Sequence, residues 1–142
     1  GERLFPLATD DSHKIQDCFG GFVMVNAEKL GYSEVFEGLK RGDFYCSTAP
    51  VFHEISIEDN IVKVVCSPVA HVTLSTDCRQ LYSKRTDGND LLTEVCFDID
   101  WYFKLSKENK VNEHQYIRIT LVDEFGNKAY SRAYFMDELI EN

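Results

Sequence analysis

The stretch that decides the fold class is His53-Glu54-Ile55-Ser56-Ile57-Glu58-Asp59-Asn60-Ile61-Val62-Lys63-Val64-Val65-Cys66. Polar and apolar residues alternate before its central pair, which is typical of a half-buried β-strand. The central pair, Asp59-Asn60, suits a tight turn, and a second apolar run follows it. The stretch therefore predicts an antiparallel hairpin with Ile55 and Ile57 on one face.

This hairpin belongs to a long β-rich part of the chain. Turn signals separate about seven short strands after residue 43, and no further helix is expected there. The other predicted strands lie at 44–48, 70–75, 92–99, 116–122 and 128–135. Residues 104–112 are expected to form a polar loop, and residues 136–142 an acidic tail. The succession predicts a mainly β chain, folded as an immunoglobulin-like antiparallel β-sandwich.

The residues before this part follow a different pattern. Residues 3–10 and Phe22–Val25 are expected to be strands, and residues 33–41 a helix. Ser33 is the expected N-cap of this helix, and Gly42 its C-terminal glycine. The order strand–strand–helix resembles the end of an α/β unit.

The change of pattern at Gly42-Asp43 predicts a domain boundary. We therefore expect one unit over residues 1–42 and a β-sandwich over residues 43–142. No Gly/Ser linker separates the two units, so they are expected to pack together.

The charge balance limits the classes of partner. The chain has 142 residues with 15 Lys+Arg and 24 Asp+Glu, a net charge of −9. Such an acidic surface disfavours nucleic-acid binding through a basic face and docking on anionic lipid. No apolar run approaches the roughly 20 residues of a membrane span, and no secretory signal is visible.

The cysteine pattern points to a reducing compartment. The five cysteines are an odd number without Cys-x-x-Cys spacing, which supports neither a disulfide scaffold nor a zinc knuckle. Cys66 and Cys96 lie inside apolar runs, so both are expected to be buried thiols. A cytoplasmic location is therefore expected.

The candidate metal ligands stand near the start of the chain. The segment Ala8-Thr9-Asp10-Asp11-Ser12-His13 places a carboxylate and an imidazole two residues apart, behind the apolar run 4–7. Both groups bind divalent cations, so Asp11 and His13 are candidate ligands. In the alternative interpretation, Asp10 or Asp11 caps a turn and His13 is merely exposed.

Several segments together resemble the C-terminal part of a PHP-superfamily (polymerase and histidinol phosphatase) phosphoesterase. The segments that carry the resemblance are 8–13, 20–25, 37–48, Cys66-Ser67-Pro68 and 116–130. Thr48-Ala49-Pro50 departs mildly from the Thr-Gly-Pro that is usual in the family. The resemblance covers nearly the whole chain, and the order of the segments is more specific than any one of them.

The resemblance implies a metal-dependent phosphoesterase of which this chain is the C-terminal part. It implies that Asp11 and His13 bind a divalent metal (Mn, Zn or Fe) and that the parent protein hydrolyses a small phosphoester. The family's other ligands come from an upstream His-x-His pair and further strands, which this sequence does not contain. We therefore expect a missing catalytic half, upstream or on a second chain, and an inactive fragment.

Other constellations compete with this interpretation. The histidines His53, His71 and His114 and the serines Ser47, Ser67 and Ser75 are expected to be structural, since no partner stands at useful spacing. Asp98 and Asp100 are expected on one strand face but are too few for a Ca²⁺ cage. The rival function is a β-sandwich binding module for a glycan, peptide or subunit. An exposed aromatic trio, Trp101-Tyr102-Phe103, would favour that rival.

Overall fold

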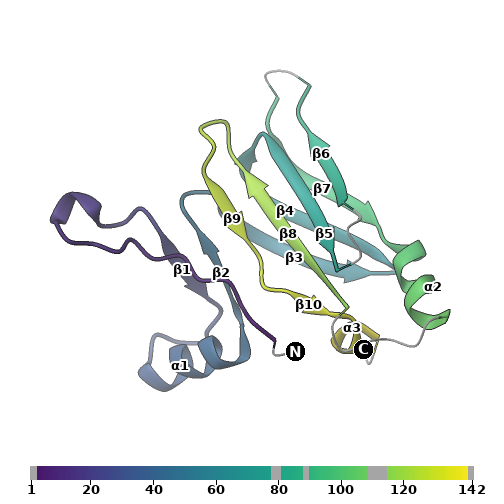
Figure 1. The fold of residues 1–142 in the computed structure, drawn as a ribbon, viewed down its shortest axis with the longest axis horizontal. Coiled ribbons are helices and arrows are strands. Elements are labelled where there is room, and N and C mark those ends of the chain that lie inside the picture. The colour runs from purple at the N-terminus through teal and green to yellow at the C-terminus, as the bar shows by residue number, and fades with distance from the viewer. Residues whose placement is uncertain (1–2, 78–80, 88–89, 109–114, 141–142) are drawn as a thin grey trace.

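The structure, a computed structural model, describes residues 3–77, 81–87, 90–108 and 115–140 (Figure 1). The elements in chain order are η1 (Ile15–Asp17), β1 (Phe22–Val25), α1 (Tyr32–Arg41), β2 (Phe44–Ser47), β3 (Phe52–Glu58), β4 (Ile61–Val69), β5 (His71–Thr76), β6 (Leu81–Arg85), β7 (Leu92–Asp98), α2 (Asp100–Glu108), β8 (Tyr116–Val122), β9 (Lys128–Tyr130), β10 (Tyr134–Phe135) and α3 (Met136–Ile140).

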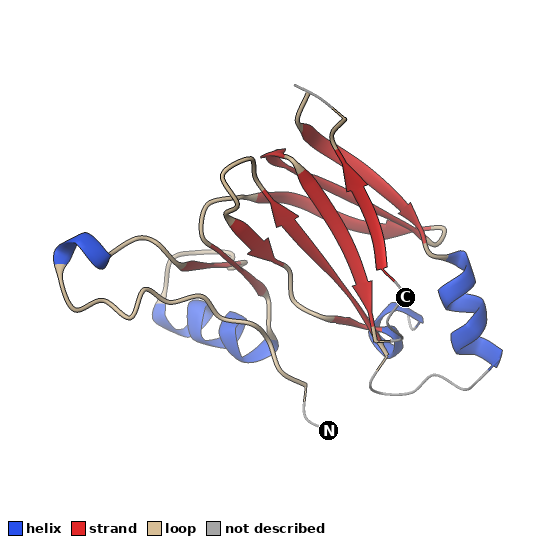
Figure 2. Cartoon of the chain, turned by 45° about the horizontal axis from the view of Figure 1, so that its top comes forward, coloured by secondary structure: helices blue, strands red, loops and turns tan. Residues whose placement is uncertain are grey.

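The strands form two antiparallel sheets that lie one in front of the other (Figures 1 and 2). Sheet A has the order β1-β2-β9-β8-β5-β6, with β10 paired to β8, and sheet B has the order β3-β4-β7. The mainly β, antiparallel prediction is therefore confirmed.

The β3–β4 hairpin forms as its alternation predicts. Glu58 pairs with Ile61, and Asp59 and Asn60 have φ angles of 49° and 63°. Two successive residues with positive φ are the mark of a type I′ turn, whose twist matches that of the strands. Residue alternation and turn chemistry thus agree at this hairpin, which explains why the sequence predicts it well.

The core lies between the two sheets. Alternate residues of β4, β5, β7 and β8 point into it, because successive side chains of a strand face opposite sides. The fully buried side chains with relative exposure of 0% include Val62, Val64, Val69, Val72, Leu74, Ile99, Tyr102, Ile117, Ile119, Leu121 and Met136. The residues that alternate with these core residues along the same strands form the outer face of each sheet.

Helix α1 matches the prediction except at its first residues. The N-cap is Gly31, not Ser33, because the Gly31 carbonyl already accepts a hydrogen bond from the Val35 N–H at 3.0 Å. At the other end Gly42 adopts a left-handed φ of 73°, and its N–H bonds to helix carbonyls. This C-terminal glycine is the one that the sequence predicts.

The aromatic residues after β7 form a helix rather than a strand or loop. Helix α2 begins where the Asp98 carboxylate accepts the Asp100 N–H at 2.9 Å. Ile99, Tyr102 and Phe103 are all buried, which fits the i, i+3, i+4 spacing of one helix face. The prediction of no helix after residue 43 is therefore wrong, and so is that of a loop at residues 104–108. Residues 109–112 of that predicted loop lie outside the described residues.

Three other predicted elements also differ. Residues 3–10 form no strand, and the tail begins as helix α3. The predicted strand 128–135 is interrupted because the Ser131 hydroxyl accepts the Ile119 N–H at 2.9 Å, where a ladder carbonyl would otherwise bond. Strand β6, which pairs with β5, is not predicted by the sequence.

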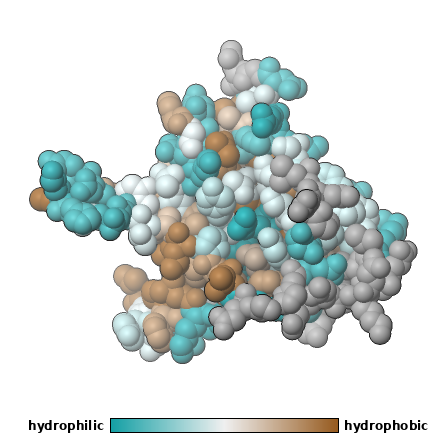
Figure 3. Space-filling view, viewed as in Figure 1, coloured by the Kyte–Doolittle hydropathy of each residue, from teal (hydrophilic) through white to brown (hydrophobic). Residues whose placement is uncertain are grey.

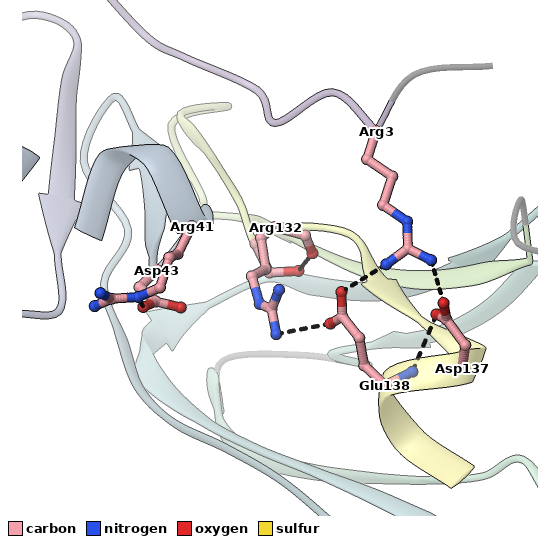
Figure 4. Close-up of polar contacts among 7 residues, drawn as sticks. Arg3, Arg41, Asp43, Arg132, Asp137 and Glu138 are labelled. Carbon is pink, nitrogen blue, oxygen red and sulfur yellow. Dashed lines mark hydrogen bonds and ion pairs between the residues drawn. The ribbon is translucent and has the colours of Figure 1, made fainter. Parts of the chain in front are cut away.

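The first residues of the chain are held by the last helix. The Arg3 guanidinium pairs with Asp137 and, at 3.0 Å, with Glu138, which also pairs with Arg132 (Figure 4). Arg3 lies 4.2 Å from the Phe135 ring centroid. Its hydrogen bond lowers the pKa of the Asp137 carboxyl below its ordinary value of 3.8. This cluster holds the N-terminal segment on sheet A.

Sheet A continues across the predicted boundary at residues 42 and 43. β1 pairs with β2 along its length, with Val23 opposite Cys46, and the Asn26 N–H bonds to the Asp43 carbonyl at 2.8 Å. Division of the chain into units 1–42 and 43–142 stays a prediction, and the two parts share a sheet.

None of the helices in the described ranges is long and apolar enough to cross a bilayer.

Leu74→Ala is expected to lower the free energy of unfolding by about 2–5 kcal/mol, because it removes buried methyl groups and leaves a cavity. Leu30→Ala is the matched control, since Leu30 is 100% exposed whereas Leu74 is 0% exposed. Urea unfolding followed by tryptophan fluorescence measures both changes. Equal losses in the two variants would contradict this placement of the core.

Candidate functional site

The segment that carries Asp11 and His13 is a loop projecting from the end of sheet A. Figure 2 shows it as the arm that bears the short helix η1, away from both sheets. Every residue from 11 to 20 is exposed. Strand β1 follows the loop and starts at Phe22. The loop thus presents its side chains to whatever lies beyond the sandwich.

Asp10 closes the base of this loop. Its Oδ2 accepts the Phe19 N–H at 2.6 Å, and its Oδ1 accepts the Gly21 N–H. A Cβ at Gly21 would lie 3.1 Å from the Thr9 carbonyl oxygen, so a glycine permits the close approach of the two backbone segments. The two bonds join residues nine and eleven positions apart and hold the loop as one turn.

A second carboxylate organises the tip of the loop. Asp17 Oδ2 accepts the N–H groups of Lys14 at 2.9 Å and of His13 at 3.2 Å. These two donors stand before η1 and have no helical partner, so the carboxylate caps them. One carboxylate therefore holds the backbone N–H groups of both His13 and Lys14.

The imidazole of His13 is oriented by the backbone of Asp11. Its Nδ1 lies 2.8 Å from the Asp11 carbonyl oxygen. Since a carbonyl oxygen only accepts, Nδ1 must carry the proton of this bond, and in the neutral ring Nε2 then has the free lone pair. Metal-binding histidines are held in the same way, with one ring nitrogen donating to a carbonyl or carboxylate.

The carboxylate of Asp11 remains open. Asp11 has a φ of 50°, a left-handed conformation that aspartate tolerates better than most residues. Within the described part of the chain, its side chain makes no hydrogen bond or ion pair, in contrast to those of Asp10 and Asp17. The capping role of the alternative interpretation thus falls to Asp10, and Asp11 stays available as a ligand.

The described residues do not complete a metal site. No group of three or more His, Cys, Asp and Glu among them is arranged to hold an ion. Asp11 and His13 therefore supply two ligand types without a third from this part of the chain. Two ligands do not build a hydrolytic centre, which needs several protein ligands and an open position.

The other histidines lie elsewhere. His53 is exposed on β3. His71 Nε2 on β5 lies 2.5 Å from the Ser83 hydroxyl and 3.0 Å from that of Thr73. Burial, aided by the charge of Arg85, lowers the pKa of His71. His114 lies outside the described residues.

Two of the three serines that the sequence offers as nucleophiles, Ser47 and Ser67, form hydrogen bonds with the backbone. Ser47 Oγ donates to the Pro50 carbonyl at 2.6 Å, and Ser67 Oγ accepts the Val51 N–H at 2.9 Å. The Ser47 hydroxyl closes the turn after β2, and the Ser67 hydroxyl joins β4 to the residue before β3. In these hydrogen bonds both hydroxyls contact backbone groups and not a general base, so the bonds stabilise the fold.

The cysteines divide between core and surface. Cys46 and Cys66 are buried, and burial raises the pKa of the Cys66 thiol to about 11. Cys96 is exposed, so the prediction of a buried thiol there is wrong. It alternates on β7 with the buried Val95 and Phe97, which explains its outward position. Cys78 lies outside the described residues.

The aromatic trio is not a binding platform. Tyr102 and Phe103 are buried at 0% and 7% exposure, and Trp101 packs against the core beside Tyr82. Asp98 and Asp100 do not share a strand face, because Asp100 belongs to α2 and pairs with Lys104. The observation that would favour a glycan- or peptide-binding module is therefore not found at these residues.

The surface around α1 is unusually apolar. The exposed large hydrophobic side chains before residue 40 are Leu4, Leu7, Ile15, Phe19, Met24, Leu30, Tyr32 and Phe36. Leu30, Tyr32, Val35 and Leu39 line a shallow depression of about 330 Å³ on α1. Figure 3 shows hydrophobic surface gathered over this end of the molecule. Contiguous apolar surface of this kind marks a contact site.

Comparisons of the chain with protein-family models, with curated proteins and with solved structures find no match in any of the three. The function is therefore argued from the geometry of the loop and its surroundings.

Asp10→Asn is expected to loosen the loop, because the amide nitrogen would replace one of two acceptor oxygens and face a backbone N–H. Amide hydrogen exchange of Phe19 and Gly21 should speed up by about tenfold, equivalent to the loss of roughly 1.4 kcal/mol.

Asp11→Asn is the matched control for this change, since asparagine tolerates the same backbone conformation and the Asp11 carboxylate caps no amide. Its exchange rates at Phe19 and Gly21 should equal those of the wild type. Equal acceleration by both substitutions would show that Asp10 does not anchor the loop.

Proposed function

We propose that this chain is part of a PHP-like metal-dependent phosphoesterase in which Asp11 and His13 are ligands of a divalent metal. The observation that carries the proposal is the hydrogen bond from His13 Nδ1 to the Asp11 carbonyl at 2.8 Å. It leaves the lone pair of the neutral ring on Nε2, and the Asp11 carboxylate two residues away makes no hydrogen bond or ion pair among the described residues. In the alternative, an exposed histidine on a turn, the same bond only satisfies a ring N–H, and the metal content of the His13→Gln variant separates the two.

Clustered divalent metals (Mn, Zn or Fe) would supply an activated water and brace the phosphoester for in-line attack. The role of this chain is narrower. Asp10 and Asp17 fix the loop backbone, the Asp11 carbonyl sets the tautomer of His13, and the two ligands present one oxygen donor and one nitrogen donor. A missing catalytic half, upstream or on a second chain, would supply the remaining ligands and the site for a small phosphoester.

The apolar surface around α1 supports the same proposal. Burial of exposed residues such as Leu30, Tyr32 and Phe36 requires a partner surface, and the missing half would provide it. In this proposal residues 1–42 close the α/β catalytic domain, and residues 43–142 form an appended sandwich of immunoglobulin-like type. We place the parent protein in the cytoplasm, in keeping with the free thiols of Cys18, Cys46, Cys66 and Cys96.

The 142-residue chain by itself is expected not to hydrolyse p-nitrophenyl phosphate with Mn²⁺ or Zn²⁺, because it holds only two of the ligands. In a longer protein that includes the catalytic half, His13→Gln should lower kcat by more than about a hundredfold, beyond the loss typical of outer partners of a metal site.

His53→Gln is the matched control in the longer protein, since His53 is an exposed histidine on β3. Its kcat and its bound metal per chain, measured by plasma mass spectrometry, should equal those of the wild type. Metal-dependent turnover by the short chain, or full metal content and activity in His13→Gln, would contradict the proposal.

A further inference from the structure

The outer face of sheet A differs in charge from the rest of the chain. Strands β5, β6, β8 and β9 contain no aspartate or glutamate, although the chain has a net charge of −9. Because Ile117, Ile119 and Leu121 point into the core, Arg118 and Thr120 point to the opposite face. The register places Ser75 opposite Arg118 and Thr73 opposite Thr120. This face is therefore rich in hydroxyl groups and basic.

The N-terminal segment covers part of this face and encloses a pocket. The pocket has a volume of about 280 Å³ and no carboxylate in its lining. Its roof is Pro6, Leu7 and Ala8, and its basic residues are Arg118 and Lys128. Figure 1 shows the N-terminal segment passing in front of β2 at this end of sheet A. Among the described residues Arg118 and Lys128 form no ion pair, and both line this pocket.

The Nε of Arg118 is buried and has no hydrogen-bond acceptor among the described residues. Arg132, by contrast, pairs with Glu138 at 3.0 Å (Figure 4). The Arg118 guanidinium lies 5.9 Å from the centroid of the Tyr130 ring, a contact that holds the group but satisfies no N–H. Arg118 lines the pocket, and the terminal N–H groups of a guanidinium bind the oxygens of an oxyanion.

We propose that this pocket binds a phosphate group, free or as a small monoester, through the Arg118 guanidinium and the Lys128 ammonium. The planar fork of arginine matches the oxygens of phosphate, and the lysine adds the second charge that a dianion prefers. The volume suits a phosphate with few further atoms. The inference does not rest on the proposed phosphoesterase, because neither Asp11 nor His13 lines the pocket.

The test is an NMR titration of the ¹⁵N-labelled chain at pH 7 and constant ionic strength, with inorganic phosphate in one arm and methyl phosphate in the other. Saturable shifts of the Arg118 Nε–Hε signal are expected. Arg118→Gln should weaken binding, read from backbone amides around the pocket, by more than about tenfold. Tighter binding of methyl phosphate would assign the site to an ester, and equal or weaker binding to the free ion.

Arg85→Gln is the matched control, because Arg85 is an exposed arginine on β6 that does not line the pocket. Its affinity should stay within about twofold of wild type, as for a surface charge. Leu7→Glu is the second variant: Leu7 is 65% exposed, so the fold should survive, and the new carboxylate would compete for Arg118. Equal weakening by Arg118→Gln and Arg85→Gln, unchanged binding in Leu7→Glu, or shifts with chloride alone would overturn the proposal.

Discussion

Gly42 lies where three parts of the chain meet: the end of α1, the start of β2 and the N-terminal segment. Its φ of 73° turns the chain from the helix into sheet A, and the Asp43 N–H bonds back to the Gly38 carbonyl at 2.9 Å. A Cβ at this position would lie 2.4 Å from Cζ of Phe5. The left-handed backbone favours glycine, and a side chain here would displace the Phe5 ring, which packs edge-on against Phe44 of β2.

The two proposed sites both depend on this arrangement. The pairing of β1 with β2 places the loop of Asp11 and His13 at the end of sheet A. The Phe5 ring packs against that of Phe44, with 6.2 Å between the ring centroids, and the residues that follow Phe5 line the Arg118 pocket. The segment between the two sites is short, since Ala8 lines the pocket and Thr9 precedes the anchoring Asp10. Position along one segment, rather than a shared cavity, connects the proposed metal ligands with the proposed anion pocket.

The sequence predicts those features that short stretches determine. The alternation before Asp59-Asn60 predicts the hairpin, and Gly42 predicts the end of α1. The sequence does not predict features that depend on distant residues. Strand β6 is stabilised by its pairing with β5. Trp101-Tyr102-Phe103 suits a strand as well as a helix until the buried face is known. The candidate ligands could be named from their spacing, but the roles of Asp10 and Asp17 could not, since Asp10 bonds to residues nine and eleven positions away.

Because β1 pairs with β2, we expect residues 1–42 to unfold in the same cooperative step as the sandwich. Urea unfolding of Gly42→Ala tests this, followed both by circular dichroism and by the fluorescence of Trp101. Trp101 lies on α2, at the opposite end of the molecule from α1 (Figure 1). We expect both midpoints to fall together, and the free energy of unfolding to fall by at least the roughly 1 kcal/mol that a non-glycine residue costs in this backbone conformation. An unchanged Trp101 transition, with early loss of helical signal alone, would contradict it.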